Sequence, residues 1–232
     1  MDAVADRERF AVLYPMALSG RWAYSDSRPV KLLNSDTQVD DIGFLNALLD
    51  KLIAERVVDA SRIYVAGVSN GALMAWTLAC HMADRLLGVA PIISGMTDRQ
   101  VEQCQPNRLV PLIVVAGTDD RMQPYDGALG EGFRLLSIPE TLEFWRRKRG
   151  CTKSAATDVP RREFSDPTRA VLVDWTECKD PSLQRFYRIE GGGHSLPSFA
   201  PLPEGKRRLH GGRSQAIETA EDLWKFFLAA TP

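Results

Sequence analysis

The sequence has almost no net charge and no long apolar run. Its 29 lysines and arginines against 30 aspartates and glutamates give a formal net charge of −1. We therefore expect neither nucleic acid nor an anionic membrane as a partner. No apolar stretch approaches the ~20 residues of a membrane span. The first ten residues mix acidic and basic side chains and lack the apolar segment of a signal peptide.

Metal-binding side chains are also scarce. The only histidines are His81, His194 and His210, and none of the four cysteines forms a C-x-x-C pair. Cys80 adjoins His81, but no second ligand pair follows at zinc spacing, so we expect no metal site. An even number of cysteines fits two disulfides in an exported protein, or free buried thiols in a cytosolic one. The first alternative is slightly favoured.

Short apolar runs alternate with amphipathic segments along the whole chain. With 232 residues and neither repeats nor a low-complexity linker, the sequence fits a single domain over residues 1–232. Several runs are apolar throughout, as are strands of a parallel sheet covered on both faces. The predicted strands are Phe10–Tyr14, Arg62–Gly67, Leu86–Ile93, Leu109–Gly117 and Leu183–Gly191.

Helical periodicity fills the intervals between these runs. Helices are predicted over residues 39–57, 71–86, 138–149 and 214–230, with Pro139 at the start of the third and Gly150 at its end. Asp36 or Thr37 is the candidate N-cap of the first helix. The predicted apolar stripes are Ile42, Leu45, Leu48, Leu49, Leu52 and Ile53 in the first helix, and Ile217, Ala220, Trp224 and Phe227 in the last.

The stretch from Cys151 to Pro181 reads as irregular, with a short hairpin. The alternation elsewhere predicts the α/β class, with a mostly parallel sheet flanked by helices.

One strand-to-helix junction contains the pattern G-x-S-x-G. A buried strand leads through Gly67, Ser69 and Gly71 into an amphipathic helix. This is the context of a nucleophile elbow, which exposes a serine hydroxyl above the sheet. We expect both glycines to be required because backbone passes close by, and the Asn70 N–H to be an oxyanion donor. The alternative is a turn whose serine only caps the helix.

Candidate acids follow the predicted strand that ends at Gly117. Asp119, Asp120 and Asp126 lie at the sheet edge where α/β folds place reactive groups. Aspartate is also common in solvated turns, so this segment alone is weak support.

A candidate base follows the last strand. His194 comes after three glycines, which would give its loop the freedom to reach Ser69. His81 falls inside a helix on another side of the fold. The H-G-G sequence at His210 is similar to the oxyanion loop of lipases, but that loop belongs before the nucleophile, so we treat this match as coincidental.

These three motifs together resemble those of a known esterase family. The chain is similar to the α/β-hydrolase serine esterases that include poly(3-hydroxybutyrate) depolymerases, feruloyl esterases and acetylxylan esterases. "PLIVVAGTDDRMQPYDG" resembles the family's G-T-x-D-x-x-x-P-Y-D-G loop and selects Asp120 over Asp119. "EGGGHSLP" resembles its G-G-G-H-T-W-P loop and selects His194. The resemblance runs from about Met1 to Phe227.

The resemblance implies further features. Cys151 is expected to bond to Cys178, and Cys80 to Cys104 with less support. Substrate contact is expected from Tyr125 and Leu196; Leu196 stands where the family has a tryptophan. No cofactor is implied, and an extracellular or periplasmic location is suggested.

The family's first strands and its oxyanion loop have no counterpart in this sequence. "MDAVADRERFAVLYP" resembles the family's first helix and the strand after it. We therefore expect a smaller sheet, with Phe10–Tyr14 pairing to the nucleophile strand, or an exposed edge that favours a homo-oligomer. A start of the natural chain upstream of Met1 is a further expectation.

The function predicted from these motifs is a serine esterase acting on small or polymeric esters, with Ser69 as nucleophile, His194 as base and Asp120 as orienting acid. The alternative is a non-catalytic protein of this fold that binds a ligand or partner, because the second oxyanion donor has no evident candidate.

Overall fold

The structure is a computed structural model that describes residues 1–24, 30–32, 35–37, 39–130, 132–162, 165–200, 202–203, 205–206 and 210–230. Its helices are α1 (Asp2–Glu8), α2 (Asp41–Ala54), α3 (Asn70–His81), α4 (Asp98–Gln103), α5 (Ile138–Arg149) and α7 (Thr219–Ala230), with short 3-10 turns η1 (Leu18–Gly20) and η2 (Ala83–Arg85). Its strands are β1 (Val30–Leu32), β2 (Ser35–Thr37), β3 (Tyr64–Val68), β4 (Gly88–Ile92), β5 (Leu112–Gly117), β6 (Ala128–Gly130), β7 (Phe133–Leu135), β8 (Lys153–Asp158), β9 (Arg169–Thr176) and β10 (Gln184–Glu190).

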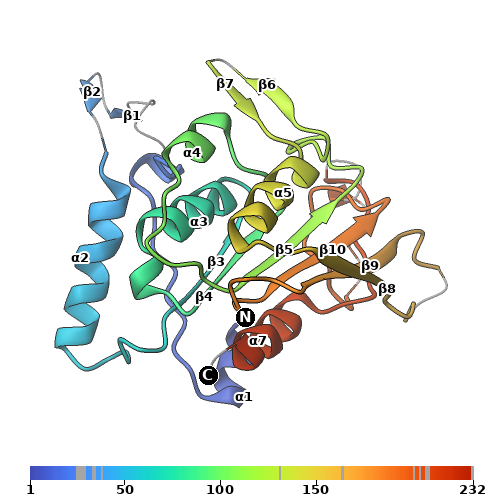
Figure 1. Cartoon of the computed structure of the whole chain (residues 1–232). Helices are drawn as coiled ribbons and strands as arrows, with labels where there is room; N and C mark the ends of the chain where they lie inside the picture. The colour runs from blue at the N-terminus through green and yellow to red at the C-terminus, as the bar shows by residue number, and fades with distance from the viewer. Residues whose placement is uncertain are drawn as a thin grey trace.

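Six of these strands form the central sheet, in the order β3–β4–β5–β10–β9–β8. The first four run parallel, and β9 and β8 continue the sheet antiparallel. The remaining four strands form two separate hairpins, β1–β2 and β6–β7 (Figure 1). The predicted mostly parallel sheet flanked by helices is therefore confirmed, and its four parallel strands match four of the five predicted runs.

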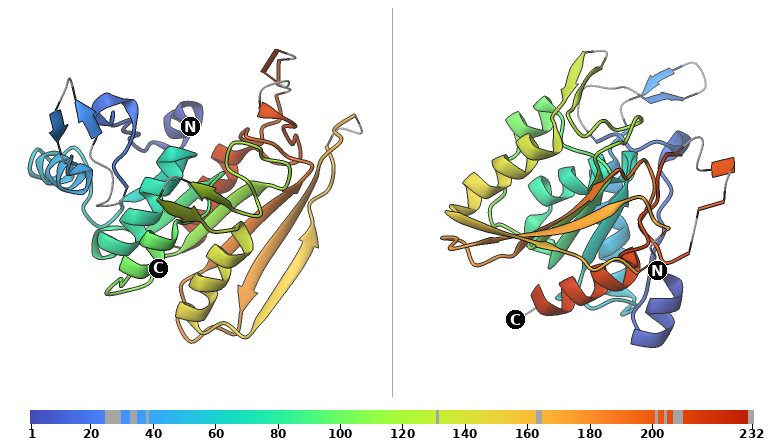
Figure 2. Two further views of the ribbon diagram at one scale, coloured as in Figure 1. Left: turned by 90° about the horizontal axis from the view of Figure 1, so that it is seen from above. Right: turned by 90° about the vertical axis from the view of Figure 1, so that its right-hand side faces the viewer.

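Side chains of β5 alternate between two apolar layers. Leu112 and Val114 pack in the layer that contains α3 and α5, whereas Ile113 and Val115 pack in the layer that contains α7. This alternation follows from the two-residue period of a strand. Figure 2 shows α7 and α1 on the opposite side of the sheet from α3 and α5. The unbroken apolar run of this segment thus reflects burial on both faces.

Helix ends follow local capping rules, with one correction. Helix α5 begins with a capping box between Ser137 and Glu140 and ends at Gly150 in the left-handed conformation, at φ 64°. Helix α2 is capped by Asp40, whose side chain accepts a hydrogen bond from the Gly43 N–H at 2.7 Å. The prediction of Asp36 or Thr37 as this cap was wrong because both residues lie in β2.

The predicted strand Phe10–Tyr14 is not formed. This segment has no regular secondary structure. Phe10 instead stacks on Trp224 of α7, with ring centroids 4.2 Å apart, and Tyr14 is 65% exposed. An apolar run forms a strand only where it can pair with a sheet edge. Here Phe10 packs against α7 instead. Consequently β3 is an edge strand of the central sheet.

Two other expectations need correction. The segment after Cys151 is more regular than expected, because β8 and β9 pair over six residues and extend the central sheet. Of the stripe predicted for the last helix, Ile217 and Phe227 are buried and Ala220 and Trp224 are only half-buried. The other buried residues of α7 are Thr219, Leu223 and Phe226. The indole of Trp224 stacks on Phe10.

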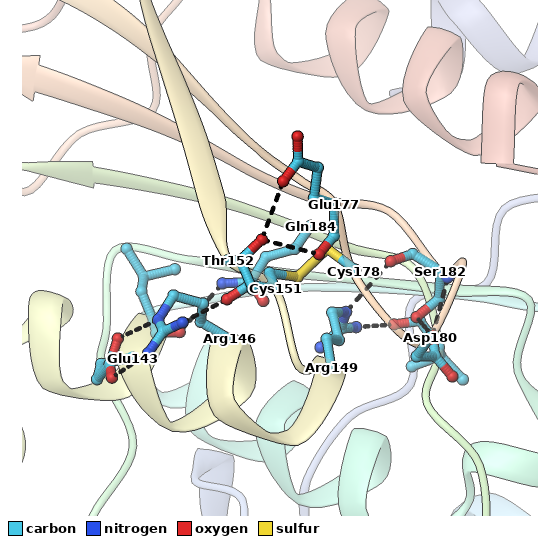
Figure 3. The surroundings of a disulfide bond; sticks show 12 residues. Glu143, Arg146, Arg149, Cys151, Thr152, Glu177, Cys178, Asp180, Ser182 and Gln184 are labelled. Carbon is cyan, nitrogen blue, oxygen red and sulfur yellow. Dashed lines mark hydrogen bonds and ion pairs between the residues drawn. A yellow bond between two sulfur atoms is a disulfide. The ribbon is translucent and has the colours of Figure 1, made fainter.

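Both disulfides are formed with the expected pairing, Cys80–Cys104 and Cys151–Cys178. Figure 3 shows the second of them, which joins the end of α5 to the turn after β9. The Arg146 guanidinium donates to the Cys151 carbonyl and pairs with Glu143 on its own helix. Thr152 donates to the Glu177 side chain, at 3.2 Å, on the other side of the bond. The disulfide therefore closes a junction that hydrogen bonds already organise.

Removing the Cys151–Cys178 bond should lower the free energy of unfolding by about 3–4 kcal/mol, because the bond closes a loop of 27 residues in the unfolded chain. Urea denaturation of the Cys151→Ala/Cys178→Ala double variant against the oxidised parent measures this. The Cys80→Ala/Cys104→Ala variant serves as the comparison, because the bond that it removes closes a loop of similar length, 24 residues. Free thiols at both positions in non-reducing mass mapping would contradict the pairing.

One edge of β3 pairs with no other strand in the described part of the chain, and this edge should make the chain self-associate. The Ser69 N–H bonds to Ile92 on β4, so by alternation Ala66 and Val68 direct their backbone groups outward, and both side chains are exposed. An open, apolar edge pairs readily with another chain. We expect concentration-dependent dimers in light scattering, and Ala66→Lys should shift them to monomer. Leu129→Lys, a matched change on the exposed hairpin strand β6, should not; equal behaviour of the two variants would exclude edge pairing.

Candidate active site

Ser69 occupies a strained turn between β3 and α3. Its backbone has φ 58° and ψ −116°, which is a left-handed value for a residue with a side chain. The Ser69 hydroxyl forms no capping hydrogen bond to α3. The alternative prediction, that this serine only caps the helix, is therefore wrong. Its N–H is held by Ile92 of β4 at 2.9 Å. Strain of this kind persists only where surrounding structure fixes it, and it concentrates at functional sites.

The two glycines of the motif are not equivalent. A Cβ on Gly67 would lie 1.9 Å from the Gly71 carbonyl oxygen, so the first glycine is required by close approach of backbone. A Cβ on Gly71 would meet nothing within 4 Å. The expectation that both glycines are sterically required was therefore wrong for Gly71.

The three predicted site residues lie in one hydrogen-bonded row. His194 Nε2 is 3.0 Å from Ser69 Oγ, and His194 Nδ1 is 2.7 Å from Asp120 Oδ2. An ionised carboxylate only accepts hydrogen bonds, so Nδ1 carries the proton and Nε2 accepts from the serine hydroxyl. The imidazole is 10% exposed and the Asp120 carboxylate 1% exposed. This arrangement lets a proton pass from the serine oxygen to the ring while a buried charge faces the opposite nitrogen.

The turn after β5 fixes Asp120 and turns its neighbour away. Asp120 Oδ1 accepts hydrogen bonds from the N–H groups of Met122 and Gln123, at 2.8 and 2.9 Å. Asp119 is exposed and takes a hydrogen bond from Thr118. Two backbone donors and the imidazole thus satisfy one carboxylate, and the structure brings Asp120 rather than Asp119 to His194.

Glycine contacts bring the acid loop and the histidine loop together. Strands β5 and β10 are parallel neighbours, so both end at the same edge of the sheet. There the Asp119 N–H donates to the Gly192 carbonyl at 2.9 Å. A Cβ on Gly117 would lie 2.2 Å from that same oxygen. Of the glycines before His194, Gly192 and Gly193 are required by close contact, because a Cβ would lie 2.5 Å from Ile189 and 2.1 Å from the His210 carbonyl oxygen, respectively, whereas Gly191 has open space around it and a φ of 72°.

Asn70 is the first residue of α3, and its N–H points out of the positive end of a helix. Its side chain has a role that the sequence did not indicate. Asn70 Oδ1 accepts from the Trp22 N–H at 2.8 Å, and its Nδ2 reaches the Trp22 carbonyl at 3.5 Å. The Ala23 N–H donates to buried Asp41, and Thr77 donates to the Tyr24 carbonyl, each at 2.7 Å. Residues 22–24 are thereby fastened beside the serine turn.

The two predicted substrate contacts lie in different layers. Leu196 is half-buried against the apolar layer of α7, and Tyr125 is half-buried against the layer of α3 and α5. Burial raises the pKa of the Tyr125 hydroxyl. Their contact with substrate stays a prediction.

None of the helices in the described part of the chain is long and apolar enough to cross a membrane.

Comparisons with known proteins identify relatives of this chain. No protein-family model matches it. It is 26% identical over 166 residues to Feruloyl esterase B of Piromyces equi, covering 68% of this chain and 30% of that protein. It is 29% identical to "Putative esterase NocK" of Nocardia uniformis subsp. tsuyamanensis, covering 98% of this chain and 68% of that protein. Other relatives are named as a bifunctional acetylxylan esterase/xylanase and a poly(3-hydroxyalkanoate) depolymerase.

Among solved structures, the acetyl xylan esterase from Aspergillus awamori aligns with 90% of this chain and 74% of its own, at a TM-score of 0.51 and 13% identity. The α/β-hydrolase fold and the resemblance to feruloyl esterases, acetylxylan esterases and polyhydroxyalkanoate depolymerases are confirmed. The chain spans under a third of the feruloyl esterase and about two thirds of the Nocardia protein.

The two glycines of the serine turn should respond oppositely to alanine. Gly67→Ala places a methyl group against the Gly71 carbonyl and should destabilise the fold by about 3 kcal/mol. Gly71→Ala fills open space near the start of α3 and should stabilise it by up to ~1 kcal/mol. Urea denaturation of both variants measures the difference. Equal effects of the two changes would mean that the close contact at Gly67 does not exist.

Proposed function

We propose that the chain is a serine esterase with Ser69, His194 and Asp120 as its catalytic residues, in a single domain over residues 1–232. The observation that supports this most is the row Ser69 Oγ–His194 Nε2 and His194 Nδ1–Asp120 Oδ2, at 3.0 and 2.7 Å, on a strained serine turn. The names of the relatives support the same class, carboxylic ester hydrolases.

The proposed reaction proceeds through an acyl-enzyme. Ser69 Oγ attacks the ester carbonyl carbon while its proton passes to His194 Nε2, and the carbonyl electrons move onto the oxygen. The imidazolium gives that proton to the leaving alcohol as the carbon–oxygen bond breaks. Water then repeats both steps, releasing the carboxylic acid and restoring the serine. Asp120 holds the ring and stabilises its positive charge throughout.

The oxyanion needs donors that face the carbonyl oxygen. The Asn70 N–H is the proposed donor, supported by its position directly after the nucleophile. Absence of one donor costs about 10²–10³ in rate. Asn70 is the one donor that we assign among the described residues, so we expect a slow enzyme unless a further N–H approaches when substrate binds. A ligand-binding protein without turnover is the competing outcome, and the hydrolysis experiment below separates the two.

Small-molecule or polymeric esters, of the polyester or plant-cell-wall type, are the proposed substrates, with Tyr125 and Leu196 as contacts. The two disulfides support an oxidising compartment, so we propose an extracellular or periplasmic location. Turnover of p-nitrophenyl esters of increasing acyl length, beside a feruloyl ester, is the measurement that assigns the acyl group.

Substitution of the three residues tests the proposal. Ser69→Ala, His194→Ala and Asp120→Asn should each lower kcat for p-nitrophenyl acetate by about 10³–10⁶-fold, and combining them should cost little more because the groups act as a unit. Asp119→Asn is the matched control and should retain turnover. Wild-type turnover by folded Ser69→Ala would refute the nucleophile, and loss confined to Asp119→Asn would move the acid by one position.

A further inference from the structure

The H-G-G sequence at residues 210–212 lies directly against the loop of His194. Gly192 and Gly212 form a parallel bridge, and the Gly193 N–H donates to the Gly212 carbonyl at 2.8 Å. The Ser195 hydroxyl donates to the same carbonyl at 2.9 Å. A Cβ on Gly193 would lie 2.1 Å from the His210 carbonyl oxygen. Only glycines permit backbones to pass this closely, so the two segments hold one another in register.

This contact places a second imidazole beside the first. The rings of His194 and His210 have centroids 6.3 Å apart and lie within 21° of parallel. That spacing falls in the range of about 4.5–7 Å in which flat rings pack on one another. The ring of His210 therefore restricts movement on one side of His194.

The hydrogen bonds of His194 restrain one movement of its ring only weakly. Its two nitrogens are taken by Asp120 and Ser69, and these two contacts define a line through the ring. A tilt of the ring about that line bends both bonds before it breaks them. Tilting misaligns the nitrogen lone pair with the serine proton, and proton transfer requires that alignment. A second ring packed nearly parallel opposes this tilt.

Within the part of the chain that the structure describes, Nδ1 of His210 does not hold the ring in place. His210 Nδ1 is buried and has no hydrogen-bond partner among the described residues. An unpaired buried nitrogen destabilises the fold, whereas the flat ring lies nearly parallel to that of His194. A phenyl ring would give the same contact without the unpaired nitrogen.

We propose that His210 is a positioning residue for the esterase site: its ring packs beside the imidazole of His194 and keeps that imidazole in the plane that proton transfer needs. The inference rests on the proposed function. It assigns a role in the same site to a residue that is 16 positions beyond the base in the chain.

The experiment compares variants that separate ring shape from polarity. His210→Ala should lower kcat for p-nitrophenyl acetate about tenfold with KM within twofold of the parent, because binding is left intact while proton transfer is misaligned. His210→Phe should restore kcat to within about threefold and raise the melting temperature. His210→Gln, polar but without a ring, should be as slow as His210→Ala. His81→Ala, at the exposed end of α3, is the matched control.

A second readout removes the substrate pocket from the comparison. The rate at which a phosphonofluoridate labels Ser69 depends on proton removal by His194, so it should fall in His210→Ala in parallel with kcat. Melting curves identify folded variants. Unchanged kcat and labelling in folded His210→Ala, or rescue by glutamine but not by phenylalanine, would overturn the proposal. Full turnover by Ser69→Ala would instead overturn the esterase mechanism, whatever the His210 variants do.

Discussion

Close backbone contact at the carboxyl edge of the sheet is the constraint on which the site depends. Gly67 lies against Gly71, Gly117 against Gly192, and Gly193 against His210. At each point a side chain would push apart two segments that carry a site residue. The strands determine the direction in which the loops approach one another. The glycines, which have no side chain, determine how close the loops come. Polar groups can then form hydrogen bonds of 2.7 and 3.0 Å between residues separated by up to 125 positions.

The two apolar layers supply the rigidity behind this edge. Trp76 of α3 and Trp145 of α5 are fully buried and stack on one side of the sheet. Leu223 and Phe226 of α7 are buried on the other side. A parallel sheet held on both faces has little freedom to bend, so the loops at its edge keep their relative positions. The disulfides add covalent closure at the ends of α3 and α5.

Much of this arrangement could be predicted from the sequence where a residue's role is decided locally. The capping of α5, the serine turn and four parallel strands all follow from patterns within some ten residues. The choice of Asp120 over Asp119, and the disulfide pairing, came from family motifs, because both aspartates are chemically alike and four cysteines permit three pairings.

The features that were not predicted from the sequence depend on contacts between residues far apart in the chain. The run Phe10–Tyr14 has the composition of a strand, but Trp224 takes its first ring. The anchoring of residues 22–24 by Asn70 and Asp41, and the approach of His210 to His194, join segments with no motif in common. The H-G-G sequence has the wrong position in the chain for an oxyanion loop, whereas its position in space places it beside His194.

Ser69, Asp120 and His194 follow strands that differ in how many neighbours support them. Ser69 follows β3, which has a strand neighbour on one side only, whereas Asp120 and His194 follow β5 and β10, which are paired on both sides. Local opening of a protein begins where the fewest bonds must break. Amide hydrogens of β3 should therefore exchange with solvent ahead of those of β5 and β10. The turn that bears the serine would loosen while the acid and the histidine remain bonded, so heat or denaturant would disable the site before the core of the sheet opens.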